Sequence, residues 1–148
     1  MTQRLYTIGF AKKTARDFFE LLRAHGIKRL VDIRRNNTSQ MAGFTKKPDL
    51  EYFLEQILSA EYHHLLLLAP DPDLLKAYRA KAVDWDEFER RYIAGLAQAR
   101  VEEKIPRDLL LGVPTVLLCS EPEPDFCHRR LAAEYLRRAW GDFEIWHL

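Results

Sequence analysis

The chain has 148 residues, with 23 Lys and Arg against 22 Asp and Glu, a hydrophobic fraction of 47% and a charged fraction of 30%. This length suits one domain with its own core, and the composition is that of a globular protein, which excludes the disordered and fibrous classes. The near balance of charge argues against general coating of nucleic acid, although it leaves room for a local basic patch.

The sequence gives no sign of export or membrane insertion. Its longest apolar run, Leu65 to Ala69, is far shorter than the roughly eighteen residues that a membrane-spanning helix needs. Residues 1–4 lead directly into a strand-like segment, without the apolar core of a signal peptide. We therefore expect a cytoplasmic protein without a membrane partner. Because that compartment is reducing and the chain has only two cysteines, we expect no structural disulfide.

The first part of the chain predicts a strand, a helix and a second strand. Residues 5–8 are strand formers. The helix after them begins at Thr14, a good N-cap, and ends at Gly26, which suits the left-handed position after a helix. Residues 30–33 are apolar apart from Asp32, which is typical of a parallel strand buried on both faces.

Residues 35–47 are polar and aperiodic, and predict a long loop. Loops of this length in a compact domain often have a function. One interpretation is a lid in which Phe44 covers a planar ligand, and the other is a solvated connection.

The rest of the chain continues the alternation of helix and strand. Helices are expected from residues 48 and 84 and over 126–139, and strands over 62–66, 115–119 and 143–148. Alternation of this kind predicts one Rossmann-like, three-layer α/β domain over residues 1–148, with a mostly parallel sheet of about five strands and helices on both faces.

Ligands of open α/β sheets bind beyond the carboxyl ends of the strands. The polar and reactive residues that follow the predicted strands are Gly9, Asp32, Arg34, Cys119, Glu121, Cys127, His128 and Arg129. We expect them to converge at one rim of the sheet.

Asp32 interrupts an apolar strand, and a buried carboxylate is costly unless it is paired. Arg34 or Arg129 could supply the partner. The residue is then either part of a structural ion pair or an acid–base group with an altered pKa.

Arg129 and Arg130 lie near the start of the last predicted helix, which Asp125 could cap. Cations are unfavourable there because of the helix dipole. Either they neutralise Glu121, Glu123 and Asp125, or Arg129 helps to complete an anion site with the free N–H groups of the helix.

Cys127 has His128 and Arg129 beside it, a setting that favours the thiolate. It is therefore a candidate nucleophile or redox-sensitive thiol, with a packed apolar role as the alternative for it and for Cys119. His128 shares a helix face with apolar residues such as Leu131, so it is either a core histidine or a catalytic one.

Known cofactor motifs are absent from the sequence. The two cysteines are separated by seven residues without a C-x-x-C pair, so we expect no metal site. The sequence has no G-x-G-x-x-G, Walker or G-x-S-x-G motif, and we expect no cofactor.

Four short motifs together resemble the domain of unknown function 488 family: Thr7-Ile8-Gly9, Asp32-Ile33-Arg34, Cys119-Ser120-Glu121 and Cys127-His128-Arg129. The resemblance runs from Leu5 to Leu148. The chain departs from it at Phe10 and Ala11, where the family often has His or Tyr and then Ser. The resemblance implies a bacterial or archaeal α/β domain with Rossmann-like layers. It implies no particular reaction, but its recurring residues are those selected at the rim.

These observations lead to three hypotheses. The first is an enzyme acting on a small anionic substrate that contains phosphate or resembles a nucleotide. Its catalytic residues would be Cys127, His128, Asp32 and Glu121, and its ligand-binding residues Gly9, Arg34, Arg129 and Cys119. The second is a non-catalytic or regulatory module that binds such a ligand or a nucleic acid. The third is a buried polar network that only holds the sheet together; no oligomeric state is predicted.

Overall fold

The structure is a computed structural model that describes residues 2–37, 43–121 and 123–148. Its centre is a five-stranded sheet in the order β3-β2-β4-β1-β5, with every pair of neighbours parallel. The strands are β1 (Gln3–Gly9), β2 (Arg29–Asp32), β3 (Glu61–His64), β4 (Thr115–Cys119) and β5 (Phe143–His147). The prediction of a mostly parallel sheet of about five strands is confirmed.

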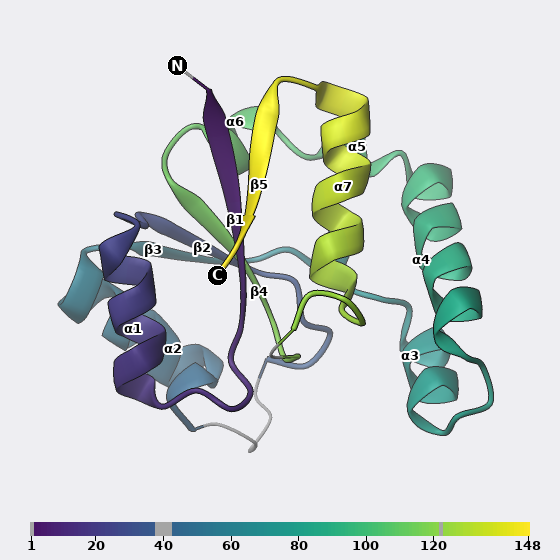
Figure 1. The fold of residues 1–148 in the computed structure, drawn as a ribbon, viewed down its shortest axis with the longest axis horizontal. Coiled ribbons are helices and arrows are strands. Elements are labelled where there is room, and N and C mark those ends of the chain that lie inside the picture. The colour runs from purple at the N-terminus through teal and green to yellow at the C-terminus, as the bar shows by residue number, and fades with distance from the viewer. Residues whose placement is uncertain (1, 38–42, 122) are drawn as a thin grey trace.

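Helices connect all the strands (Figure 1). They are α1 (Ala15–Ala24), α2 (Lys47–Phe53), α3 (Pro72–Arg79), α4 (Trp85–Ala99), α5 (Val101–Lys104), α6 (Arg107–Leu111) and α7 (His128–Trp140). Short helical turns are η1 (Gly43–Thr45), η2 (Leu54–Leu58) and η3 (Leu66–Leu68).

The two faces of the sheet carry separate halves of the core. Helices α1 and α2 pack on one face against strand residues that include Ile8 and Leu30. Helices α3 to α7 lie on the other side of the sheet, where the core includes Val31 and Leu117, and α4 packs outside α7 (Figure 1). Neighbouring strand residues point to opposite faces of the sheet, and apolar residues occupy both faces. Helices cover each face, so the prediction of three layers is confirmed.

The local signals at the first helix are confirmed. Thr14 caps α1 by accepting a hydrogen bond from the backbone N–H of Asp17, and Gly26 has a φ of 64° after its end. The last helix differs from the prediction, because it begins at His128 with Cys127 as its N-cap. The expected cap at Asp125 is wrong, since the chain makes a turn before the helix starts, with the Cys127 N–H bonded to the Pro124 carbonyl.

The order of the strands creates a topological switch point at β4. The chain passes from β1 to β2 and β3 through helices on one face, and from β3 to β4 and β5 through helices on the other. The loop after β4 therefore leaves towards the opposite face from the loops after its neighbours β1 and β2. Such a switch point is where ligands bind in open α/β sheets.

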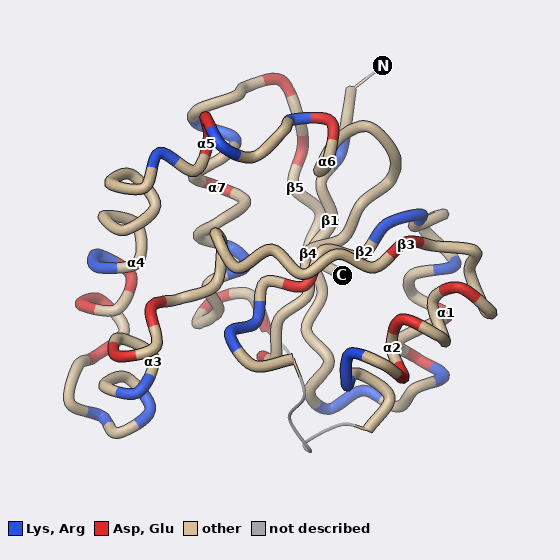
Figure 2. The backbone as a smooth tube through the Cα atoms, turned by 180° about the vertical axis from the view of Figure 1, so that it is seen from behind, with Lys and Arg blue, Asp and Glu red and all other residues tan. Residues whose placement is uncertain are grey.

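Basic and acidic residues are interspersed around the fold (Figure 2), in keeping with the net charge of +1. Among the residues that the structure describes, no helix is long and apolar enough to cross a membrane.

Candidate functional site

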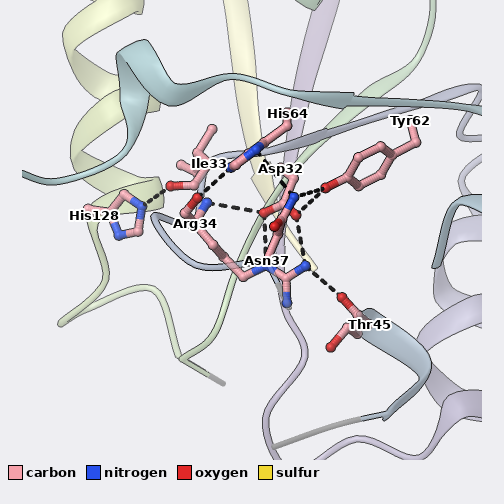
Figure 3. Close-up of polar contacts among 8 residues, drawn as sticks. All are labelled: Asp32, Ile33, Arg34, Asn37, Thr45, Tyr62, His64 and His128. Atoms are coloured by element: carbon pink, nitrogen blue, oxygen red, sulfur yellow. Dashed lines mark hydrogen bonds and ion pairs between the residues drawn. The ribbon is translucent and has the colours of Figure 1, made fainter. Parts of the chain in front are cut away.

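At the end of β2, Asp32 and Arg34 form an ion pair inside the protein (Figure 3). Arg34 Nε lies 2.8 Å from Asp32 Oδ1 and Nη2 lies 2.7 Å from Oδ2, while the backbone N–H of Arg34 also donates to Oδ1. The Asp32 side chain is 0% exposed and that of Arg34 is 5% exposed. Because both side chains are buried, each charge is stabilised by the other, and removal of either one would leave a buried charge without its counter-ion.

Residues from β3 and from the segment after β2 surround this pair (Figure 3). The hydroxyl of Tyr62 donates to Asp32 Oδ2 at 2.7 Å and accepts from Asn37 Nδ2. His64 donates from Nε2 to the Arg34 carbonyl and accepts from Asn37 at Nδ1. Burial and the Asp32 charge raise the pKa of Tyr62 well above its usual value, which keeps the hydroxyl available as a donor. Both oxygens of Asp32 are thus engaged within the protein.

His128 ties the start of α7 to the end of β2 (Figure 3). Its Nε2 donates to the carbonyl of Ile33 at 2.8 Å, and its ring packs edge-on against Tyr92. Burial lowers the pKa of His128 to about 4, so the imidazole is neutral near pH 7. The side chain is a hydrogen-bond donor to the backbone and a weak base.

Arg129 is fully buried and holds the loop after β4. Its Nη1 donates to the backbone carbonyl of Glu121 and lies 3.3 Å from Cys119 Sγ, and its Nε donates to Thr7 Oγ1. A buried guanidinium with these partners fixes the loop against the ends of β1 and β4. The same close approach explains Gly9, because a Cβ there would fall on the Glu121 carbonyl oxygen.

Cys119 and Cys127 are joined by a disulfide, with their Cα atoms 7.4 Å apart. This separation is wider than the roughly 4.4 to 6.8 Å of most disulfides. The sequence predicted no structural disulfide, and the structure has a disulfide between its two cysteines. The sequence alone did not show the pairing, because it depends on how the loop between β4 and α7 folds back. A nucleophilic role for Cys127 would require reduction of this bond.

A cavity of about 100 Å³ opens beside these residues, between the loop after β2, the loop after β4 and helices α3 and α4. Of the residues predicted from the sequence, Arg34, Glu121, Cys127 and His128 line it. The others, Gly9, Asp32, Cys119 and Arg129, lie behind this lining and hold it through the contacts described above. The eight residues are thus divided between a cavity wall and its support.

The cavity also has walls that sequence reasoning missed. They consist of Arg79 and the aromatic side chains of Tyr78, Trp85, Phe88 and Phe126. Arg35, which follows the second predicted strand, also lines the cavity. Trp85 stacks on Phe88 with an interplanar angle of 20°, and Phe126 meets Trp85 edge-on. On the sequence, Trp85 and Phe88 fit the apolar face of an ordinary helix. Nothing local in that pattern indicated that α3 and α4 close one side of the rim.

Phe44 does not cover this cavity. Its ring packs against Phe18 and Phe19 of α1, on the opposite face of the sheet. The lid interpretation is therefore wrong for Phe44, while residues 38–42 of the same predicted loop lie outside the described residues. In the described parts of the chain, no group of three or more His, Cys, Asp or Glu side chains is placed to hold a metal ion.

Comparison with known proteins gives the family of the chain. Residues 14–136 match the family model described as Domain of unknown function DUF488. The chain belongs to the DUF488 family. Among curated proteins, this DUF488 chain is 33% identical over 70 residues to the uncharacterized protein YeaO of Escherichia coli (strain K12), a match that covers 47% of the chain and 61% of YeaO. No solved structure matches it.

Proposed function

We propose that this DUF488 protein binds a small anionic ligand that carries a planar ring, such as a nucleoside monophosphate, in the cavity beside Cys127. The observation that carries the proposal is the lining of the cavity: arginine side chains and an aromatic wall meet at the carboxyl end of a parallel sheet. The arginines would bind the anion and the aromatic side chains would pack on the ring.

The cationic side of the cavity comes from three arginines. Arg34 commits Nε and Nη2 to Asp32, and its Nη2 also donates to the carbonyl of Thr45. Arg35 donates from Nε to the Pro70 carbonyl, which fixes the side chain and leaves its Nη groups for a ligand. Arg79 is exposed at the end of α3. Guanidinium groups of this kind suit phosphate or carboxylate, which they bind with two parallel hydrogen bonds.

The aromatic side chains of the cavity favour a ligand that has a planar ring. Trp85 and Phe88 have their ring centroids 5.2 Å apart, and Phe126, which is 61% exposed, stands at the edge of the cavity. A cavity of about 100 Å³ is smaller than the roughly 300–1,000 Å³ of sites for drug-sized ligands, so a nucleoside monophosphate would place either its ring or its phosphate inside and the rest at the opening. Glu121 also lines the cavity, and its carboxylate can accept a hydrogen bond from a ligand hydroxyl or amino group.

Binding is better supported than catalysis. The oxygens of Asp32 are engaged by Arg34 and Tyr62, and Cys127 is part of a disulfide. Nε2 of His128 is bonded to a backbone carbonyl. Glu121 is therefore the acid–base candidate that keeps a side chain available at the cavity.

The test is titration with adenosine monophosphate, adenosine and inorganic phosphate, followed by calorimetry and by tryptophan fluorescence. We expect saturable binding of the monophosphate, with weaker binding of the two fragments. Arg79→Ala should weaken it about tenfold through loss of a charge-assisted contact. Arg138→Ala, an exposed arginine in the last turn of α7, is the matched control and should bind like the wild type.

Two results would change the conclusion. Absence of saturable binding, or equal binding by wild type and Arg79→Ala, would contradict the proposed site. Affinity that rises steeply with the length of a single-stranded oligonucleotide and falls with salt would favour the nucleic-acid-binding alternative.

A further inference from the structure

The disulfide between Cys119 and Cys127 joins the end of β4 to the N-cap of α7. The loop that it closes contributes Ser120, Glu121 and Phe126 to the cavity wall. The bond therefore lies in the wall of the candidate site and not in a remote part of the fold.

The two sulfurs have different surroundings. Cys127 lines the cavity and is 3% exposed, whereas Cys119 is fully buried at the end of the central strand. A reagent that enters the cavity would therefore meet Cys127 first.

The environment of Cys119 suits a thiolate. Arg129 Nη1 lies 3.3 Å from its sulfur, in a region with no access to solvent. The Lys13 ammonium donates to the carbonyl of Gly9, the residue paired with Cys119 across β1 and β4, so a second cation lies at this strand end. These two cations would stabilise a negative charge on the Cys119 sulfur when the disulfide breaks, and a stabilised leaving thiolate departs faster in disulfide exchange.

The environment of Cys127 also favours a thiolate. Cys127 is the N-cap of a helix of 13 residues, and its own side chain makes no capping hydrogen bond. The positive end of the helix dipole would stabilise a thiolate at Cys127 once the bond is broken.

We propose that Cys119 and Cys127 form a redox-active pair that undergoes thiol–disulfide exchange with low-molecular-weight thiols through the cavity. The sulfur of an incoming thiolate attacks Cys127 Sγ, a mixed disulfide forms, and Cys119 leaves as a thiolate beside Arg129. A second thiol then attacks the outer sulfur of the mixed disulfide and releases Cys127. In total, the protein disulfide and two thiols give the protein dithiol and one small disulfide, with transfer of two electrons and two protons.

This activity goes beyond the proposed ligand binding and does not depend on it. The first experiment is to treat the folded wild-type protein, purified without reductant, with 2-mercaptoethanol and then with iodoacetamide, and to count alkylated cysteines by mass spectrometry. We expect no alkylated cysteine before treatment and alkylation of Cys127 after it, with the near-ultraviolet circular dichroism of the folded state retained. Cys119 should be alkylated as well once the treated protein is unfolded in the presence of iodoacetamide. Addition of 2-hydroxyethyl disulfide to the reduced protein should restore the bond.

The second experiment distinguishes the two sulfurs. Under native conditions, Cys119→Ser should form a mixed disulfide with 2-hydroxyethyl disulfide at least about tenfold faster than Cys127→Ser, because only Cys127 faces the cavity. Each variant is its partner's control, since each retains one cysteine. Circular dichroism establishes that both are folded before they are compared.

Three outcomes would overturn the proposal. The first is a disulfide that resists the thiol until the chain unfolds, which would make it structural. The second is a pair of free thiols that do not join when the oxidant is added. The third is equal modification of the two folded single-cysteine variants, which would remove Cys127 as the entry point.

Discussion

The carboxylate of Asp32 and the guanidinium of Arg34 meet through two hydrogen bonds of 2.8 and 2.7 Å, although only one residue separates them at the end of β2. The pair is inside the protein, and Arg34 still reaches the cavity wall. Asp32 therefore positions an arginine of the candidate site while it compensates the charge of that arginine.

Removal of the Asp32 charge should destabilise the protein. In Asp32→Asn the guanidinium of Arg34 stays buried without its counter-ion, and breaking a buried pair costs about 3–5 kcal/mol. We expect that loss in the free energy of unfolding measured by urea denaturation. The control is Glu144→Gln, which breaks an exposed pair with Arg4 and should leave the free energy of unfolding nearly unchanged. A stable Asp32→Asn protein that no longer binds ligand would show a direct functional role for Asp32.

Glycine is required at position 9. In Gly9→Ala the new Cβ would collide with the backbone of Glu121 and with Arg129, so the loop after β4 has to move. We expect a lower melting temperature and weaker ligand binding. Gly95→Ala is the matched control, because Gly95 is exposed in α4 and a Cβ there meets nothing within 4 Å. That change should stabilise the helix by about 0.5–1 kcal/mol, and a Gly9→Ala protein as stable as the wild type would contradict the close approach.

His128 should make stability depend on pH. Its pKa is lowered to about 4 in the folded protein, against an ordinary value of 6.5, so below pH 6.5 the unfolded chain takes up a proton that the folded chain does not. The contribution of neutral His128 to the free energy of unfolding is therefore fully present above pH 6.5, and it decreases as the pH falls towards 4. The contribution of this residue should fall by about 2 kcal/mol between pH 7.5 and pH 5.

The measurement is urea denaturation at both pH values for wild type, His128→Gln and His63→Gln. His63 is a half-exposed histidine, so His63→Gln is the control for replacing a histidine that is not buried. His128→Gln should show a smaller loss on acidification. Equal losses in all three proteins would mean that His128 is not buried as a neutral group.

The hydroxyl of Tyr62 should contribute to the stability of the folded protein. Tyr62→Phe removes the donor to Asp32 and the acceptor for Asn37 while it keeps the ring. An unsatisfied buried group costs about 1–3 kcal/mol, so we expect a loss of that size in the free energy of unfolding. Tyr52→Phe is the control, because Tyr52 is 59% exposed, and a significant loss there would point to a general effect of removing a hydroxyl.

The sequence was sufficient where neighbouring residues decide the structure. The apolar pattern of residues 115–119 matches β4, and Thr14 caps α1 as expected. Asp84 likewise caps α4 through the N–H of Glu87. Strand periodicity and capping depend on interactions within a few residues, which the chain itself displays.

Sequence reasoning was incomplete wherever a partner lies far along the chain. It left open whether Arg34 or Arg129 pairs with Asp32. In the structure, Arg34 forms the ion pair with Asp32, and Arg129 donates to the carbonyl of Glu121. The arrangement follows from the packing of β2 beside β4, which brings two loops together at one edge of the sheet.

The order of residues alone was enough to predict the alternation of helix and strand, the buried parallel sheet, and the concentration of polar residues at one rim. These features follow from periodicity, capping and the common direction of parallel strands. Only the tertiary structure decided that Cys119 meets Cys127, and that Arg79 and Trp85 complete the cavity. The physical reason is that those contacts depend on distances between segments separated by whole helices and loops, and such distances are set when α3, α4 and α7 pack on the sheet.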